Sequence, residues 1–200
     1  SEKVLFMRIF LSVLILIFGL QSWTKADDIR DFQIEGISIG DSLLKYMTTS
    51  QIKNSIVVSN YKSDEYKTII ANLNLKTFER VQVSFKSNDK EFLIEGIMAI
   101  KSYKNKNFKD CTSLALKIAE EASSLFKNTQ RQSKTFPHQV DKTGKTKVVA
   151  NYFMLKDGSN VRALCVDYSS EQEKLKKIDH LNVGAVTNKF NQFLNNVAYK

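Results

Sequence analysis

Histidine and cysteine side chains carry much of the metal and acid–base chemistry of proteins, and this chain has few of them. It contains two histidines, His138 and His180, and two cysteines, Cys111 and Cys165. Neither histidine has a second histidine or a cysteine three or four residues away. Zinc sites need several such ligands at short spacing, so we expect no metal site and no cofactor.

The carboxylates do not form a recognisable catalytic set either. Asp179 directly precedes His180, but adjacent residues of a strand point to opposite faces, so we expect His180 to be a turn or surface residue. Glu120 and Glu121 fall on the solvent side of an expected helix, which argues against a carboxylate pair for sugar chemistry. No nucleophile-elbow, P-loop or dinucleotide-binding motif occurs, and we predict no catalytic residues.

These observations favour a non-catalytic protein, either a binding module or an envelope-interaction module. The alternative is a small hydrolase-like enzyme with an unrecognised active site. A pocket that collected His180, Asp167 and a serine or threonine would favour the enzyme, whereas dispersal of these residues would favour the binding module.

The two cysteines can be joined to each other. Cys111 and Cys165 are 165 − 111 = 54 positions apart. In an oxidising compartment a lone pair most simply forms a disulfide, and chain entropy then stabilises the fold by roughly 4 kcal/mol. The alternative is two buried free thiols. No C-x-x-C motif is present, so we do not expect redox catalysis.

Residues 1–26 determine the expected compartment. After upstream residues, a short basic start at Met7-Arg8 precedes the apolar run Ile9–Leu20, and the small residue Ala26 ends the segment. This order is typical of a secretory signal peptide, so we predict cleavage after Ala26. An uncleaved anchor is the alternative, although a spanning helix needs roughly 20 apolar residues. The mature chain, residues 27–200, is then periplasmic or secreted, without stable membrane insertion.

The chain is basic, with a formal net charge of +9 at pH 7. Outside the cell, the natural partners of such a chain are an envelope protein, an anionic lipid or a cell-wall polymer, and we expect no nucleic-acid binding. One connector interleaves lysines with Tyr103 and Phe108, an arrangement that can bind anionic polymers. A solvated loop is the alternative explanation. The lysines of this connector are Lys101, Lys104, Lys106 and Lys109.

Hydrophobic periodicity predicts an α+β fold, an antiparallel sheet covered by two or three helices. The clearest helix is 107–125, whose apolar stripe runs from Cys111 to Leu125. Shorter helices are expected at 42–48 and after Thr187, which can cap the last one. Apolar runs predict strands at 32–39, 64–75, 81–86, 92–103, 147–155, 161–168 and 181–186, with polar loops at 128–134 and 169–177. For 64–75 a helix is the alternative, because Tyr66, Ile69, Ile70 and Leu73 also fit one helix face.

An internal echo indicates a duplication. Phe32–Ile37 and Phe92–Ile97 match in five of six positions at an offset of 92 − 32 = 60. A helix pattern follows each segment. The echo predicts two related strand–helix–strands units, residues 27–90 and 91–200, within one α+β domain.

Two segments near the C-terminus, Asp179–Val183 and Thr187–Leu194, accompany the Cys111 helix and the Cys165 strand. With these features the C-terminal half is similar to the ending of uncharacterised secreted proteins of AT-rich bacteria, a resemblance that implies no activity. In addition, Ile37–Leu44 resembles the strand-to-helix opening of β-lactamase-inhibitor-like repeats. Those repeats are small helix-on-antiparallel-sheet modules that bind other envelope proteins, so the resemblance implies a protein partner in the envelope.

Overall fold

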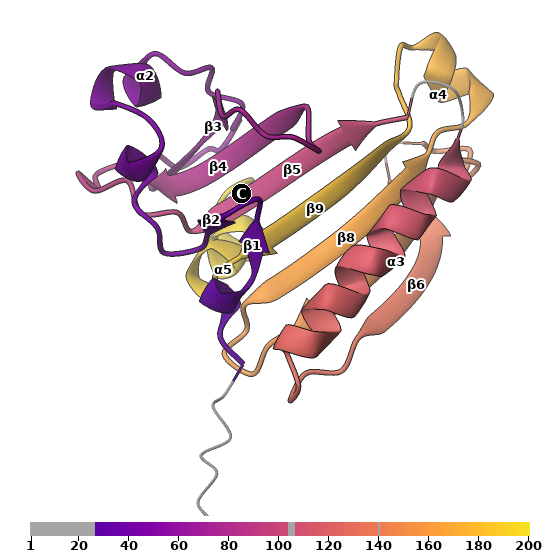
Figure 1. Ribbon diagram of the computed structural model, residues 1–200. Helices are drawn as coiled ribbons and strands as arrows, with labels where there is room; N and C mark the ends of the chain where they lie inside the picture. Colours follow the sequence, from indigo (N-terminus) through magenta and orange to yellow (C-terminus); the bar gives the residue numbers. More distant parts are fainter. Residues whose placement is uncertain (1–26, 104–106, 140) are drawn as a thin grey trace, which may run out of the picture.

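The fold is built on one antiparallel sheet of seven strands (Figure 1). The computed structural model describes residues 27–103, 107–139 and 141–200. Across the sheet the strands are β3 (Tyr66–Ala71), β4 (Arg80–Lys86), β5 (Gly96–Ser102), β9 (His180–Val186), β8 (Asn160–Asp167), β7 (Lys147–Met154) and β6 (Gln132–Pro137). Every neighbouring pair is antiparallel. With the helices described next, the sheet confirms the predicted α+β class.

The last strand of the chain lies in the middle of the sheet. The strands β3–β4–β5 form one meander and β6–β7–β8 form another. Strand β9 pairs with β5 on one side and with β8 on the other, so that Ala99 and Ala163 flank Val183. The two meanders therefore become one sheet only when β9 is in place.

One long helix and several short elements complete the fold. The helical elements are η1 (Ile29–Asp31), η2 (Leu43–Lys45), α2 (Thr49–Lys53), α3 (Phe108–Leu125), α4 (Ser170–Lys174) and α5 (Asn188–Asn196), and a hairpin joins β1 (Gln33–Ile34) to β2 (Ile37–Ser38). The buried side of α3 consists of Cys111, Ala115, Ala119 and Ala122. These small side chains let the helix lie close to β7, β8 and β9 (Figure 1).

The helix α3 is fastened covalently to the sheet. The Sγ atoms of Cys111 and Cys165 are 2.07 Å apart, and their Cα atoms are 6.0 Å apart. Both side chains are fully buried. The predicted disulfide is therefore confirmed, and the alternative of two free thiols is wrong. The core on this face also includes Phe32, Ile34 and other residues of the N-terminal hairpin.

Two expectations about the helices are wrong, one at the end of α3 and one at residues 42–48. Leu125, expected on the buried stripe, is 44% exposed, because α3 ends there and Phe126 takes the buried place. The expected single helix at 42–48 is instead the short η2, capped by Ser42, followed by a separate α2. The helix α2 begins after Thr48, whose side chain forms a capping box with Gln51.

Two stretches expected as loops contain regular structure. The range 128–134 leads into the edge strand β6, whose six residues are all exposed. No alternation of apolar and polar residues marks a strand with both faces in solvent, which is why the sequence pattern missed it. The range 169–177 contains α4, a short polar helix that begins after Ser169.

The two echo segments have different local structures. Glu35 and Gly36, with φ angles of 50° and 88°, form the turn between β1 and β2, whereas Gly96 begins β5. The segments nevertheless adjoin each other, since Gly40 N donates to the carbonyl oxygen of Ile94 at 2.8 Å. The duplication stays a prediction.

The expected signal peptide, residues 1–26, lies outside the described residues. Within the described ranges, none of the helices combines the length and the apolar character that crossing a membrane requires.

Candidate functional site

The face of the sheet opposite the disulfide carries the polar side chains that could bind a ligand. On β8, Arg162 lies between Val161 and Ala163, which belong to the core beneath α3, so Arg162 points to the opposite face. The same alternation places these residues on this second face: Thr68, Gln82, Ser84, Met98, Ile100, Arg162, His180 and Asn182. This face has a hollow at each end. We name them the α5 hollow and the His180 hollow.

The α5 hollow lies between the sheet and α5 and has a volume of about 320 Å³. Apolar and aromatic groups line it, among them Tyr61, Met98, Phe190, Leu194 and Tyr199. Polar groups line it as well, among them Thr68, Gln82, Ser84 and Arg162. The hollow is therefore amphipathic, as small-molecule sites commonly are.

Close packing positions the aromatic wall of the α5 hollow. The ring centroid of Tyr66, on β3, is 5.0 Å from that of Phe190 and 4.8 Å from that of Phe193. Gly96 permits this approach, because a Cβ atom there would stand 2.8 Å from the Phe190 ring. Thr187 caps α5 by accepting a hydrogen bond from Phe190 N at 3.1 Å.

A chain of hydroxyl groups lines part of the α5 hollow. The Tyr61 hydroxyl is 2.9 Å from Thr68 Oγ1, which is 2.7 Å from Ser84 Oγ. Tyr61 also packs edge-on against Phe193, with ring centroids 5.2 Å apart. The loop that carries Tyr61 is thereby tied both to the sheet and to α5.

Arg162 is the charged group of the α5 hollow. In the sheet register it lies between Tyr152 of β7 and Gly184 of β9. Its Nε atom would be 3.5 Å from a Cβ atom at Gly184, so the side chain extends over this glycine. Burial lowers the pKa of Arg162, and Tyr152 opposes this effect. The side chain of Arg162 forms neither a hydrogen bond nor an ion pair with any of the described residues.

The His180 hollow lies further along the same strands and has a volume of about 580 Å³. Arg80 and Ile100 line it, two positions from Gln82 and Met98 of the α5 hollow. Two residues of a strand span about 6.7 Å, so the hollows are neighbours on one face. The remaining lining residues are Glu79, Ser102, Tyr168, Lys176, Lys177, Ile178 and His180.

His180 begins β9 and is half-buried, so that of the two expected positions, turn or surface, the turn is wrong. Its Nδ1 atom is 3.0 Å from the carbonyl oxygen of Ile178, which assigns the proton of the neutral ring to Nδ1 and leaves Nε2 as an acceptor. Burial lowers the pKa of His180, the hydrogen bond to Ile178 opposes this effect, and the nearby Arg80 and His138 lower the pKa further. The rings of His138 and His180 lie 5.8 Å and 5.9 Å from that of Tyr168.

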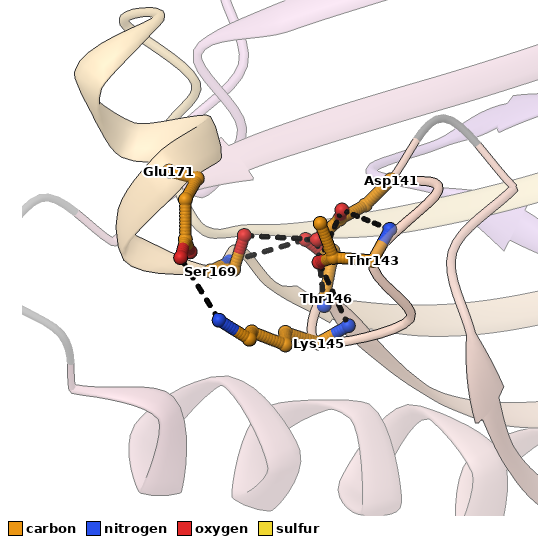
Figure 2. A network of polar contacts seen from close by, with 6 residues as sticks. All are labelled: Asp141, Thr143, Lys145, Thr146, Ser169 and Glu171. Atoms are coloured by element: carbon orange, nitrogen blue, oxygen red, sulfur yellow. Dashed lines mark hydrogen bonds and ion pairs between the residues drawn. The ribbon is translucent and has the colours of Figure 1, made fainter.

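A buried carboxylate fixes the loops beside the His180 hollow (Figure 2). Asp141 is 4% exposed and accepts hydrogen bonds from Thr143, Thr146 and Ser169, with Oγ–O distances of 2.6, 2.7 and 2.8 Å. These bonds, that from Thr143 first, hold the pKa of Asp141 well below its usual range. Ser169 precedes α4, and His138 N donates to the carbonyl oxygen of Thr146 at 2.9 Å. We name this network the Asp141 clamp.

The predicted anion-binding lysines are not gathered in either hollow. Lys101 Nζ donates to the carbonyl oxygen of Thr77 at 3.4 Å and lies 6.0 Å from the Tyr103 ring centre. Lys109 is exposed on α3. Lys104 and Lys106 lie outside the described residues. Anion binding by this connector stays a prediction.

The residues that would have supported a hydrolase are not all brought together. Ser102 and His180 line the same hollow and pair across β5 and β9. Asp167 follows Cys165 by two positions on β8 and therefore lies on the disulfide face. Among the described residues no group of three or more His, Cys, Asp or Glu side chains could hold a metal ion.

The sequence analysis missed the two arginines of these hollows. Arg162 had a recognisable signal, since it is a charged residue within the apolar run Val161–Val166. Arg80 had none, because it precedes an alternating strand in which Gln82 and Ser84 are also polar. No family model, curated protein or solved structure matches the chain.

Proposed function

We propose that the protein is a non-catalytic binding protein that holds a small amphipathic carboxylate in the α5 hollow. The observation that carries this proposal is Arg162, a half-buried cation that lines an amphipathic hollow. No carboxylate of the described residues pairs with it. Withdrawing a charge from water without a partner is unfavourable for folding, so the position of Arg162 in a hollow points to a ligand that supplies the opposite charge.

The chemistry of the hollow favours a carboxylate with an apolar body. A planar guanidinium pairs with a carboxylate through two parallel hydrogen bonds. Phe190, Leu194 and Tyr199 line the same hollow and offer the apolar body a surface to pack against. The volume of about 320 Å³ is at the lower end of the range for ligand pockets, which favours a small molecule over a polymer.

We propose further that the protein works in an exported location, periplasmic or secreted. The disulfide between Cys111 and Cys165 supports this location, because such bonds persist in oxidising compartments. The signal-like order of residues 1–26 supports it as well. An envelope protein or an anionic surface polymer as a further partner stays a prediction.

Calorimetric titration with octanoate, and with 1-octanol as a neutral ligand of the same chain length, tests the binding proposal. We expect octanoate to bind more tightly than 1-octanol. We expect Arg162→Gln to weaken octanoate binding about tenfold or more, the effect of losing a charged hydrogen-bonded pair. The control is Arg131→Gln, which removes an exposed arginine outside the hollow.

Two outcomes would refute the proposal. The first is equal affinity of the native protein for octanoate and 1-octanol, since the charge of the ligand would then be irrelevant. The second is equal octanoate binding by Arg162→Gln and Arg131→Gln. The variant Leu194→Asp, which places a carboxylate among the apolar lining residues, checks independently that the tail occupies this hollow, because it should weaken octanoate binding.

A further inference from the structure

We infer that the His180 hollow is a second binding site, for a tetrahedral oxyanion such as a phosphate or sulfate group. Three cationic side chains surround this hollow, Arg80 from β4 and Lys176 and Lys177 from the segment after α4. Glu79 is the one lining carboxylate, so the formal charge of the lining is 3 − 1 = +2 with His180 neutral. This site is independent of the α5 hollow, because it shares no lining residue with it.

The cations of the His180 hollow are not engaged elsewhere. Among the described residues, no ion pair or side-chain hydrogen bond involves Arg80, Lys176 or Lys177. Cations that balance an acidic neighbour would be paired with it, whereas Arg80, Lys176 and Lys177 border a common space. Several cations around one hollow raise the local concentration of anions.

The backbone that carries the lysines is held in a fixed and uncommon conformation. Lys176 has a φ of 62°, a left-handed conformation that glycine or asparagine usually adopts at the end of a helix. Its N–H donates to the carbonyl oxygen of Glu173 at 2.8 Å. On the other side, the Asp141 clamp fixes Ser169, and the buried Asp179 carboxylate accepts from Tyr168 N at 2.7 Å. The backbone around the site is therefore held in place before any ligand binds.

His180 couples the site to pH. Nε2 of the neutral ring has no proton to donate to an anion, but the protonated ring can donate one there. An anion in the hollow therefore favours protonation of His180, so that binding takes up a proton and tightens as the pH falls through the range in which His180 titrates. The charged and titratable groups around His180 are Glu79, Arg80, His138, Tyr168, Lys176, Lys177 and Asp179.

Proton NMR of the two imidazoles measures this directly, because the chain has only two histidines. His138→Gln assigns the signals. We expect sulfate to shift the His180 signal and to raise the pKa of His180, compared with sodium chloride at equal ionic strength. Sulfate suits the pH series because its charge is constant where histidine titrates. We expect Arg80→Gln and Lys176→Gln each to weaken sulfate binding about tenfold, and Lys53→Gln, on α2, to leave it unchanged.

Inorganic phosphate and vesicles then distinguish the sources of the anion. A His180 shift with inorganic phosphate assigns a soluble phosphate group, whereas co-sedimentation only with phosphatidate-containing vesicles, and not with pure phosphatidylcholine, assigns a lipid headgroup. The inference is wrong if neither sulfate, phosphate nor vesicles affect His180 beyond the sodium chloride control. It is also wrong if Lys53→Gln weakens binding as much as Arg80→Gln, since the effect would then be general attraction to a basic protein.

Discussion

Replacing both cysteines by alanine, as Cys111→Ala/Cys165→Ala, should remove a large part of the stability of the fold. The bond closes a loop with a sequence separation of 54 residues. The loop-closure entropy of such a loop corresponds to about 4 kcal/mol at 25 °C, against a typical total of about 5–15 kcal/mol. For a chain of this size, 1 kcal/mol corresponds to about 2–4 °C, so we expect the melting temperature to fall by about 8–16 °C.

Urea unfolding followed by far-ultraviolet circular dichroism measures the difference. The native protein in reducing agent should unfold at the same urea concentration as the double variant, and reducing agent should not change the double variant at all. The structure adds a reason for a large effect, because α3 contacts the sheet mainly through alanines, which bury little apolar surface. A loss of less than about 1 kcal/mol would refute the reasoning, because loop closure would then not limit the unfolded chain.

Four further predictions concern the second face and its surroundings. Gly96→Ala should destabilise the protein by about 1–3 kcal/mol in urea unfolding and weaken octanoate binding, because the new Cβ atom would stand 2.8 Å from the Phe190 ring. Arg162→Met should raise the free energy of unfolding by about 1 kcal/mol while abolishing octanoate binding, since it removes an unpaired charge from a hollow; lower stability would contradict this. Asp141→Ala should lower the melting temperature at pH 7. It should also make the melting temperature fall less steeply at acid pH, because the lowered pKa of Asp141 stabilises the native protein at pH values above 3.8, the ordinary pKa, and this stability is lost as the pH falls further. His180→Asn should flatten the loss of stability as the pH falls below 6.5, because the unfolded chain binds a proton there before the folded chain does; an unchanged slope would refute the lowered pKa of His180.

The elements that the sequence predicted well are those with a buried face. The helix α3 and the strands β4, β7, β8 and β9 each place apolar residues at a regular period along one buried side. The strand β6 has no buried residue, so its period carries no signal. The β1–β2 hairpin depends on the positive φ angle of Gly36, and η2 depends on the N-cap formed by Ser42. Both features act over only a few residues.

The candidate site was less predictable because it depends on pairings between distant segments. Local pattern predicts that β9 is a strand, but it does not say that β9 separates β5 from β8. Arg162 lies 64 positions after Met98, by the difference 162 − 98, yet both line one hollow. The disulfide could be predicted because there were only two cysteines, so no choice among pairings was needed.

Both hollows lie where the two meanders meet. The α5 hollow combines Gln82 and Met98 of the first meander with Arg162 of the second, and α5 closes it. The His180 hollow combines Arg80 of the first meander with Tyr168, which follows the second, and β9 supplies His180 between them. A ligand bound in either hollow, as proposed above, would contact both halves of the sheet at once and so favour the assembled form. By mass action such ligands stabilise the junction made by the last strand and helix of the chain, so binding and completion of the fold are coupled.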